Sequence, residues 1–562
     1  MFSGLLGLFC TLCIAQSIPN APTILTGNQA QTPAPAPTQS SSVLAWSLYC
    51  NGDFAGASGQ YQQMLKENPK SADAYAGLTH VYLKQKNVDL ASQTVAEGLA
   101  LSNSPSLHVA LGEVEFRQGK ISEAEQEWVK VINSGHLDPR AFLGLARVSD
   151  AVAMYKRGKA MIDKAHELDP TDPDIERQWI RTMPRRRQIE NLEEYLSGPN
   201  DENPEQRARI NRYLEYLRVR SQGANASCRM VSNVKATETP LLRLLRDADH
   251  LRGYGLAVKV NDRKSTLMLD TGASGILLDR GVAEKAGITK LTETSIGGIG
   301  DKGLRGGYFG IAKTISVGGL EFQNCPVEVL ENRSVVGDEG LIGADVFEDF
   351  LVDIDFQNEK LRISALPKRP EDAARPPGLY SEDDEDSDTP EEQTGNAATA
   401  GTAEKSISPP KPRFHDAYIA PEMKSYTRVF RFGHYLLIPT YVGNSPSKLF
   451  LIDSGSYGNE ITPAAAREVT KVRGDAFMHV TGISGRVNKV YSADDAVIRV
   501  GHLRQENEYI VAFDLTSTSE SAGMEVSGIL GFAMLRLLDV KIDYRDALVD
   551  LYHDPSPRQT LK

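Results

Sequence analysis

The feature that most constrains this chain is a duplicated tripeptide. Asp-Thr-Gly at 270–272 returns 183 positions later (453 − 270) as Asp-Ser-Gly at 453–455, and each copy directly follows a short apolar run. An apolar-apolar-Gly segment ends 73 residues after the first aspartate (343 − 270) and 78 residues after the second (531 − 453). One such tripeptide is common by chance, but two copies in matching surroundings indicate a duplicated structural unit.

The segments around each tripeptide have the alternation of β-strands. Residues 254–260 and 436–442 alternate before the two aspartates, and similar Val-x-Ile-Asp tails close the copies at 352–355 and 540–543. The sequence therefore predicts two copies of one all-β unit, the first over residues 249–365 and the second over residues 414–562.

A strand that ends in such a tripeptide delivers a carboxylate into a tight turn. If Asp270 and Asp453 face each other, they cannot easily both ionise, so they share one proton. The ionised carboxylate can then activate a water molecule, while the protonated one hydrogen-bonds a carbonyl oxygen. Such a pair can add water to a carbonyl carbon.

The pattern resembles the retropepsin/pepsin superfamily of aspartic peptidases, with two retropepsin-sized lobes fused in one chain. The resemblance implies that Asp270 and Asp453 are the catalytic dyad, that the substrate is a polypeptide, and that no cofactor or metal is needed. It implies hydroxyl buttresses between the lobes and glycine turns without a Cβ, carried here by Thr271, Gly272, Ser454 and Gly455.

Members of this superfamily cover the substrate with a glycine-rich hairpin, the flap. Residues 296–308 and 481–491 fit such hairpins, and Tyr308 and Tyr491 each lie 38 residues after their aspartate (308 − 270 and 491 − 453). We consider two interpretations of these tyrosines: flap residues, or equivalent cross-strand positions of the repeat. The fourth position differs between the copies, Ala273 against Ser456, which leaves the pH optimum open.

Two alternatives to a single-chain peptidase stay open. The first is a catalytically inactive peptide-binding scaffold of the same fold. The second is an enzyme whose lobes pair between two chains, since residues 366–413 form a linker long enough to allow it. That linker carries a run of acidic residues and is predicted to be a solvated, disordered tether.

A helical repeat precedes the two β units. From 43 to 173 small residues recur at intervals of 32 to 35 positions, namely Ala57, Ala91 and Ala124 and then Gly77, Gly112 and Gly144. The period and composition resemble tetratricopeptide repeats, which implies an all-α solenoid that binds a protein partner. Residues 174–248 are predicted to continue as a helical cap and connector.

The N-terminus has the pattern of a targeting segment. Residues 1–15 are predicted to be a signal peptide and residues 16–42, rich in Pro, Thr, Ser and Gln, a spacer. The expected location is therefore secreted or periplasmic. We expect no integral membrane segment beyond the signal, because no apolar run of about 18 residues follows it, and the formal charge of −12 argues against a nucleic-acid partner.

The remaining chemistry-bearing residues are few. After the signal only Cys50, Cys228 and Cys325 remain, which allow at most one disulfide within the chain. The ten histidines are scattered and match no metal-binding motif. The complete prediction is a multidomain chain, with an N-terminal all-α solenoid followed by two all-β retropepsin-like lobes that form a bilobal aspartic peptidase.

Overall fold

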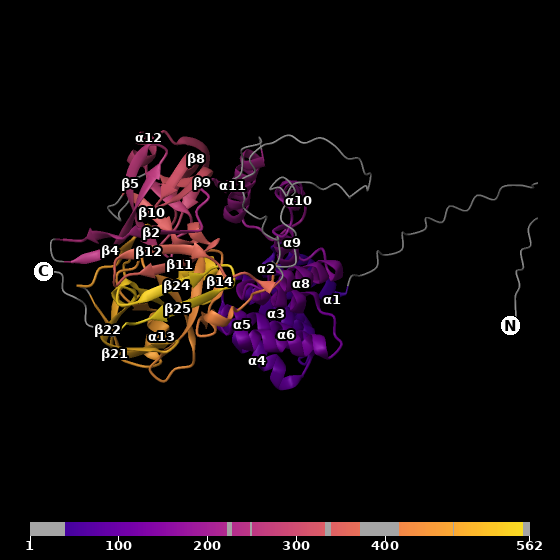
Figure 1. Cartoon of the computed structure of the whole chain (residues 1–562). Helices are drawn as coiled ribbons and strands as arrows, with labels where there is room; N and C mark the ends of the chain where they lie inside the picture. Colours follow the sequence, from indigo (N-terminus) through magenta and orange to yellow (C-terminus); the bar gives the residue numbers. More distant parts are fainter. Residues whose placement is uncertain are drawn as a thin grey trace, which may run out of the picture. The chain divides into compact units, whose positions relative to one another are not determined.

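The computed structural model describes residues 40–221, 228–247, 250–331, 339–370, 415–475 and 477–554. Helices make up the first part of the chain and strands dominate the rest (Figure 1). The predicted signal peptide, nearly all of the predicted spacer and most of the predicted linker lie outside the described residues.

Eight helices in four consecutive antiparallel pairs form the repeat region. Side-chain oxygens of Asp53, Ser71, Asn87 and Asp138 accept hydrogen bonds from backbone N–H groups at four helix starts, which satisfies donors that a helix leaves unpaired. The helices are α1 (Ser41–Cys50), α2 (Phe54–Glu67), α3 (Ala72–Lys84), α4 (Val88–Leu101), α5 (Pro105–Arg117), α6 (Ile121–Asn133), α7 (Pro139–Ala151) and α8 (Tyr155–Leu168).

The recurring glycines lie where helices touch. A Cβ on Gly77 would come within 2.2 Å of the Tyr61 ring, and Cβ atoms on Gly112 and Gly144 would come within 2.6 and 2.4 Å of the Trp128 ring. Trp128 is fully buried between these two glycines. The sequence period thus marks the sites of closest helix–helix approach.

Acidic residues that follow the repeats bind basic residues within them. Lys84 on α3 lies 2.7 Å from a carboxylate oxygen of Asp174, and Arg140 on α7 lies 2.7 Å from one of Asp172. Asp172 is fully buried and Asp174 nearly so. These two basic side chains are therefore already paired within the chain, which restricts the solenoid surface left for another protein.

The structure differs from the predicted helical connector over residues 174–248. Its helices α9 (Pro173–Ile180), α10 (Arg185–Ser197) and α11 (Pro204–Ser221) end well before residue 248, and strands β1 (Arg229–Met230), β2 (Ala236–Pro240) and β3 (Leu242–Leu245) follow. In β2, the β-branched Thr237 and Thr239 alternate with exposed residues, and the strand pairs with β12. The first β lobe therefore begins before residue 249.

Lobe 1 is built on a nine-stranded sheet in which β5 lies between β4 and β10. In β5 the apolar residues Leu267 and Leu269 are fully buried, and Asp270 is the last residue of this strand. The remaining elements are β4 (Leu251–Val260), β5 (Arg263–Asp270), β6 (Ile276–Asp279), α12 (Arg280–Lys285), β7 (Thr289–Ile296), β8 (Arg305–Val317), β9 (Leu320–Leu330), β10 (Gly340–Gly343), η1 (Ala344–Phe347), β11 (Phe350–Asp355) and β12 (Lys360–Ala365).

Lobe 2 repeats this plan with an eight-stranded sheet in which β16 lies between β15 and β23. It is made of η4 (Pro421–Met423), β13 (Thr427–Arg428), β14 (Phe430–Phe432), β15 (Tyr435–Val442), β16 (Lys448–Asp453), β17 (Glu460–Ile461), α13 (Pro463–Arg467), β18 (Val472–Gly474), β19 (Thr481–Gly482), β20 (Gly485–Arg486), β21 (Tyr491–Val500), β22 (Leu503–Ala512), α14 (Thr516–Ala522), β23 (Gly528–Gly531), α15 (Phe532–Leu535), β24 (Asp539–Asp543) and β25 (Leu548–Tyr552).

A third sheet joins the two lobes of the same chain. Its six strands run in the order β13-β25-β24-β11-β12-β2, and β11 of lobe 1 pairs antiparallel with β24 of lobe 2 (Figure 1). Val352 faces Ile542 across this junction, and both are fully buried. The duplicated tails seen in the sequence are therefore the strands that hold the lobes together.

The helical repeats also contact lobe 2 directly. The N–H of Glu525 donates a 2.8 Å hydrogen bond to the carbonyl of Arg117, and the guanidinium of Arg117 donates to the carbonyl of Gly523. The Phe116 and Phe432 rings meet edge to face at 6.3 Å. Lobe 2 and α5 thus share an interface with both polar and apolar contacts.

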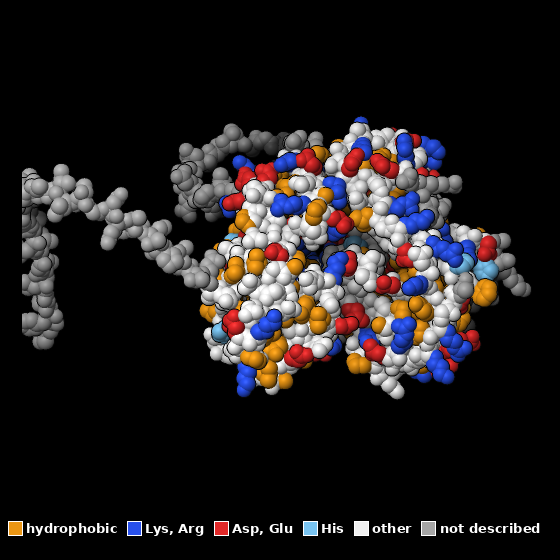
Figure 2. Space-filling view, turned by 180° about the vertical axis from the view of Figure 1, so that it is seen from behind, with side chains coloured by type: hydrophobic (Ala, Val, Ile, Leu, Met, Phe, Trp, Pro, Cys, Tyr) orange, Lys and Arg blue, Asp and Glu red, His pale blue; other side chains and the backbone are white. Residues whose placement is uncertain are grey.

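Two of the three cysteines that follow the predicted signal peptide are bonded to each other. Cys228 forms a disulfide with Cys325, which ties the segment before β1 to β9, while Cys50 is free. On the face shown in Figure 2, Lys and Arg side chains are interspersed with Asp and Glu side chains. Within the described ranges, no helix is both long and apolar enough to cross a membrane.

Candidate active site

Asp270 and Asp453 end equivalent strands and approach each other. Each lies beside the glycine of an apolar-apolar-Gly segment on a parallel neighbour, Asp270 opposite Gly343 and Asp453 opposite Gly531. Their side chains are hydrogen-bonded to each other. The structure thus brings together two carboxylates that lie 183 positions apart in the sequence.

The glycines beside the aspartates leave room for this approach. A Cβ on Gly455 would lie 2.4 Å from Oδ2 of Asp270, and one on Gly272 would lie 2.6 Å from Cγ of Asp453. Each glycine N–H also donates a 2.8 Å hydrogen bond to the aspartate two residues before it. Each loop therefore leaves room for the carboxylate of the other loop. Each loop also stabilises negative charge on its own aspartate.

The electrostatics of the pair place one proton on it. Burial and the negative charge of Asp453 raise the pKa of Asp270 well above its ordinary value. Burial also raises the pKa of Asp453, but the hydrogen bond from Asp270 and those from the backbone of Ser456 and Gly455 lower it. The buried pair therefore shares one proton, which belongs to the pair and not to either carboxyl alone.

This shared proton predicts an unusual stability profile for Asp270→Asn. A carboxyl with a raised pKa stabilises the fold below its unfolded-state pKa, about 3.9, and this contribution is lost as pH rises through its folded-state pKa. Asparagine does not ionise, so the variant does not lose this stability as the pH rises. We expect the melting temperature of Asp270→Asn to exceed that of the wild type by about 2–4 °C at pH 7 and to match it near pH 3. Scanning calorimetry at both values tests this, and a lower value for the variant at pH 7 would contradict a shared proton.

Hydroxyl groups cross-link the two aspartate loops. Thr271 Oγ1 donates to the Ile452 carbonyl at 2.9 Å and accepts from the Ser454 N–H at 2.9 Å. Ser454 Oγ donates to the Leu269 carbonyl at 2.9 Å and accepts from the Thr271 N–H at 3.1 Å. Both side chains are buried, so the four bonds fix the two loops without competition from water.

Removing one of these hydroxyls is expected to destabilise the fold. Thr271→Val keeps the shape but leaves the Ile452 carbonyl and the Ser454 N–H buried without a partner. At about 1–3 kcal/mol for each of the two unsatisfied groups, we expect the free energy of unfolding to fall by about 2–6 kcal/mol. Urea denaturation measures the loss. Thr271→Ser keeps the hydroxyl and serves as control, and an equal loss in both variants would assign the effect to packing.

Hairpins form at both segments that were predicted to be flaps, and their tips meet. The hairpin β7–β8 of lobe 1 presents residues 297–304, and the small hairpin β19–β20 of lobe 2 presents Ile483 and Ser484. The N–H of Lys302 donates to the Ser484 carbonyl at 2.8 Å, and the N–H of Ser484 donates to the Ile299 carbonyl at 3.0 Å. The two tips are therefore hydrogen-bonded backbone to backbone.

The two candidate tyrosines lie in strands and not at these tips. Tyr308 pairs with Val329 between β8 and β9, and Tyr491 pairs with Ala512 between β21 and β22, at the same register in each lobe. Tyr308 is largely buried in the core of its lobe. This placement corresponds to the cross-strand interpretation of their equal offsets.

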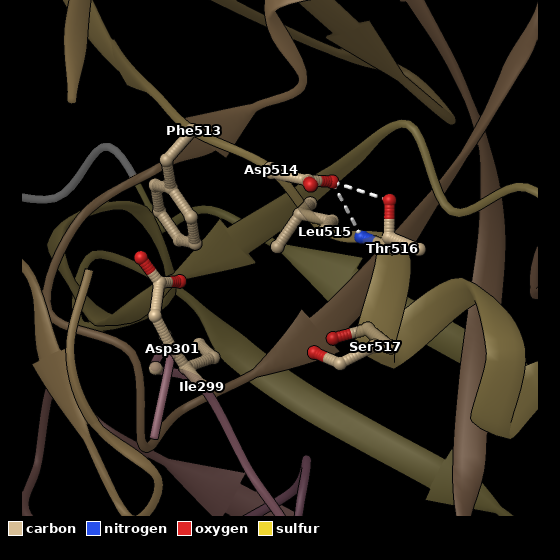
Figure 3. A pocket seen from close by; sticks show the side chains of 9 residues that line it. Ile299, Asp301, Phe513, Asp514, Leu515, Thr516 and Ser517 are labelled. Carbon is tan, nitrogen blue, oxygen red and sulfur yellow. Dashed lines mark hydrogen bonds between the residues drawn. The ribbon is translucent and has the colours of Figure 1, made fainter. Parts of the chain in front are cut away.

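A pocket opens beside the lobe 1 flap tip (Figure 3). Ile299 and Asp301 from the tip face Phe513, Asp514 and Leu515 of the loop before α14. The pocket is open to solvent and has a cavity volume of about 110 Å³. Its surface is more polar than apolar, and two carboxylates line it.

Two residues near the dyad were not among the predicted site residues. His434 is hydrogen-bonded to the backbone of Gly272, and burial lowers its pKa to about 4. Glu460 lies close enough to Asp453 for that charge to raise its pKa. Comparing the repeats position by position would have found Glu460, because a leucine, Leu277, stands at its place in the first copy. No motif marks His434.

Comparison with known protein families agrees with this geometry for one lobe and for the repeats. A family model described as aspartyl protease matches residues 256–346, which include Asp270 and Gly343. A tetratricopeptide repeat model matches residues 48–108. Lobe 1 contains an aspartyl protease domain. The helical region preceding this protease domain contains tetratricopeptide repeats, and both predictions of family are confirmed.

Individual relatives match only parts of the chain. Human tetratricopeptide repeat protein 21B is 29% identical over 124 residues, 21% of this chain and 9% of its own length. The UBA domain-containing protein Mud1 of Schizosaccharomyces pombe is 32% identical over 114 residues, 19% of this chain and 31% of its own. The chain thus spans less than a third of either curated relative.

Two solved structures are similar at low identity. An aspartic proteinase from Irpex lacteus is 13% identical, with a TM-score of 0.33, over 57% of this chain and 98% of its own. PilF of Pseudomonas aeruginosa is 20% identical, with a TM-score of 0.23, over 32% of this chain and 80% of its own.

Proposed function

We propose that this chain is an aspartic endopeptidase that hydrolyses peptide bonds between Asp270 and Asp453. The observation that carries the proposal is the hydrogen-bonded pair of carboxylates at the ends of equivalent strands, one in each lobe. The aspartyl protease match over residues 256–346 supports it for the first lobe. Thr271, Gly272, Ser454 and Gly455 support the pair through the contacts described above.

In this proposal the two carboxyls of the pair take different tasks. The ionised one accepts a proton from the water molecule that attacks the scissile carbonyl carbon. The protonated one donates a hydrogen bond to the carbonyl oxygen as negative charge develops there. Transfer of a proton to the leaving amine then breaks the C–N bond, and no covalent enzyme intermediate forms.

The flaps and the repeats supply the binding functions in this proposal. Extended polypeptide would lie between the dyad and the hairpin tips and pair its backbone with their edges. The tetratricopeptide repeats would bind a protein partner on surface left free by the internal ion pairs of Lys84 and Arg140.

We further propose a secreted or periplasmic location. The disulfide between Cys228 and Cys325 supports it, because such bonds persist in oxidising compartments and are rare in the cytosol. Fusion of residues 1–42 to a reporter, followed by fractionation of the cells, would test whether this segment directs export.

Digestion of casein by the purified protein tests the proposed activity. We expect cleavage between about pH 3 and 7, where one carboxyl of a shared-proton pair is ionised. Gel electrophoresis and mass spectrometry identify the products. If folded protein cuts nothing across this range, the alternative of a peptide-binding scaffold replaces the enzyme.

A further inference from the structure

Glu460 occupies a position that the two-fold repeat makes comparable with Leu277. Each lies seven residues after its aspartate (460 − 453 and 277 − 270). Glu460 pairs with Ile529 in the adjacent strand, and Leu277 pairs with Leu341 in the same way. The two lobes therefore present different chemistry at one and the same structural position.

In lobe 1 that position belongs to an apolar cluster under the opposite flap, and Glu328 is its neighbour on the adjacent strand. Leu277 packs in a cluster with Ile296, Leu330 and Leu341, and Ile483 of the lobe 2 flap tip packs against this cluster. In lobe 2 the equivalent face of the sheet carries Ile529 and Phe513, and Ile299 of the lobe 1 flap tip packs against it. Glu460 thus brings a carboxyl onto the flap-facing side of the sheet.

The carboxyl of Glu460 is buried and has an oxygen without a hydrogen-bond partner. Only 6% of the residue is exposed. The hydroxyl of Ser456, which stands where lobe 1 has Ala273, lowers the pKa of this carboxyl. Oε2 has no hydrogen-bond partner among the described residues. An unpaired buried oxygen costs free energy that an incoming donor would recover.

No cation in the described part of the chain neutralises Glu460 by an ion pair. Burial raises its pKa to about 8, and the charge of Asp453 acts in the same direction. In the free protein the group is therefore held mainly as the neutral acid near neutral pH. A positive charge placed beside it would favour the carboxylate and form a charge-assisted hydrogen bond.

We propose that Glu460 determines substrate specificity by binding a lysine or arginine side chain of the polypeptide, close to the bond that is cut. This inference rests on the proposed peptidase function and names its substrate class. The pocket beside the lobe 1 flap tip is also acidic, because Asp301 and Asp514 line it next to Phe513 (Figure 3). The Phe513 N–H donates to the carbonyl of Ile461, the neighbour of Glu460.

A peptide series with one position changed at a time tests the inference. Each position near the scissile bond carries either lysine or norleucine, which has a similar length and no charge. At one position we expect the wild type to cleave the lysine peptide with a kcat/KM at least about ten times higher. Glu460→Gln should reduce this ratio to within about two-fold, and Glu460→Leu should reverse it. Leu277→Met is the matched control in lobe 1 and should keep the lysine preference.

The outcomes separate this inference from the peptidase proposal. Equal cleavage of lysine and norleucine peptides by the wild type, or full lysine preference in Glu460→Gln, would overturn the role of Glu460 while the enzyme stands. If the wild type cuts no peptide, the same pairs are made with a reduced, uncleavable bond and their binding is measured by fluorescence anisotropy. Tighter binding of lysine peptides that is lost in Glu460→Gln supports the site, and equal binding overturns it. Melting temperatures of all variants confirm folding.

Discussion

Replacement of Asp270 or Asp453 by asparagine is expected to lower kcat/KM for casein or a quenched fluorescent peptide by at least about a thousand-fold. Each substitution leaves a single carboxyl. One carboxyl cannot both accept the proton of the attacking water and supply the proton that polarises the carbonyl. The amide keeps the size of the side chain, so the loss reports chemistry and not packing.

The pattern of loss matters as much as its size. Because the two groups act as one unit, the double variant should be no less active than either single variant. Asp262→Asn is the matched control, since that side chain is fully exposed on the turn between β4 and β5, and it should retain wild-type activity. Residual activity above about a tenth in either dyad variant would show that the two carboxyls do not work together.

Gly455→Ala should have the second-largest effect. The new Cβ would lie 2.4 Å from Oδ2 of Asp270, a separation that atoms do not adopt, so the carboxyl must move away from Asp453. Displacement by about 1 Å at a reacting group costs about a hundred-fold in rate. We therefore expect kcat/KM to fall by about two orders of magnitude while the protein stays folded.

Gly458→Ala provides a control in the same loop. A Cβ there meets no atom within 4 Å, so the substitution changes the same residue type three positions away without crowding the dyad. Its activity should remain within about two-fold of the wild type. Similar losses in both variants would mean that the loop needs glycine for its backbone and not for the approach of Asp270.

The duplicated tripeptide was sufficient to predict the core of the fold and the meeting of its carboxylates. Strands β5 and β16 are apolar runs that end at Asp270 and Asp453, and β10 and β23 are the apolar-apolar-Gly segments. A repeat of this kind carries its three-dimensional symmetry in the spacing of its residues. The period of the glycines predicted the helical repeats for the same reason, because Gly77 lies at a contact between helices.

Features set by tertiary contact were not predictable in this way. The segment after α11 was expected to be helical, but β2 forms because β12 offers an edge, which its own short sequence does not show. The pairing of Cys228 with Cys325 needed the fold to bring β1 and β9 together. The position of Glu460 is not marked by the repeat either, because the repeat shows residues that agree between the copies and Leu277 stands at this place in the first copy.

Titration of the wild-type protein with a statine-type peptide tests the central claim most directly. The statine hydroxyl takes the place of the attacking water between the carboxyls, so such a compound binds more tightly than substrate. We predict that casein cleavage falls linearly with added inhibitor and stops at one inhibitor per chain, because each pair of Asp270 and Asp453 binds one inhibitor. The specific activity should not change when the protein is diluted, because one chain supplies both carboxyls. Cleavage that the inhibitor does not affect would contradict the dyad, and a specific activity that falls steeply on dilution would contradict a dyad formed within a single chain.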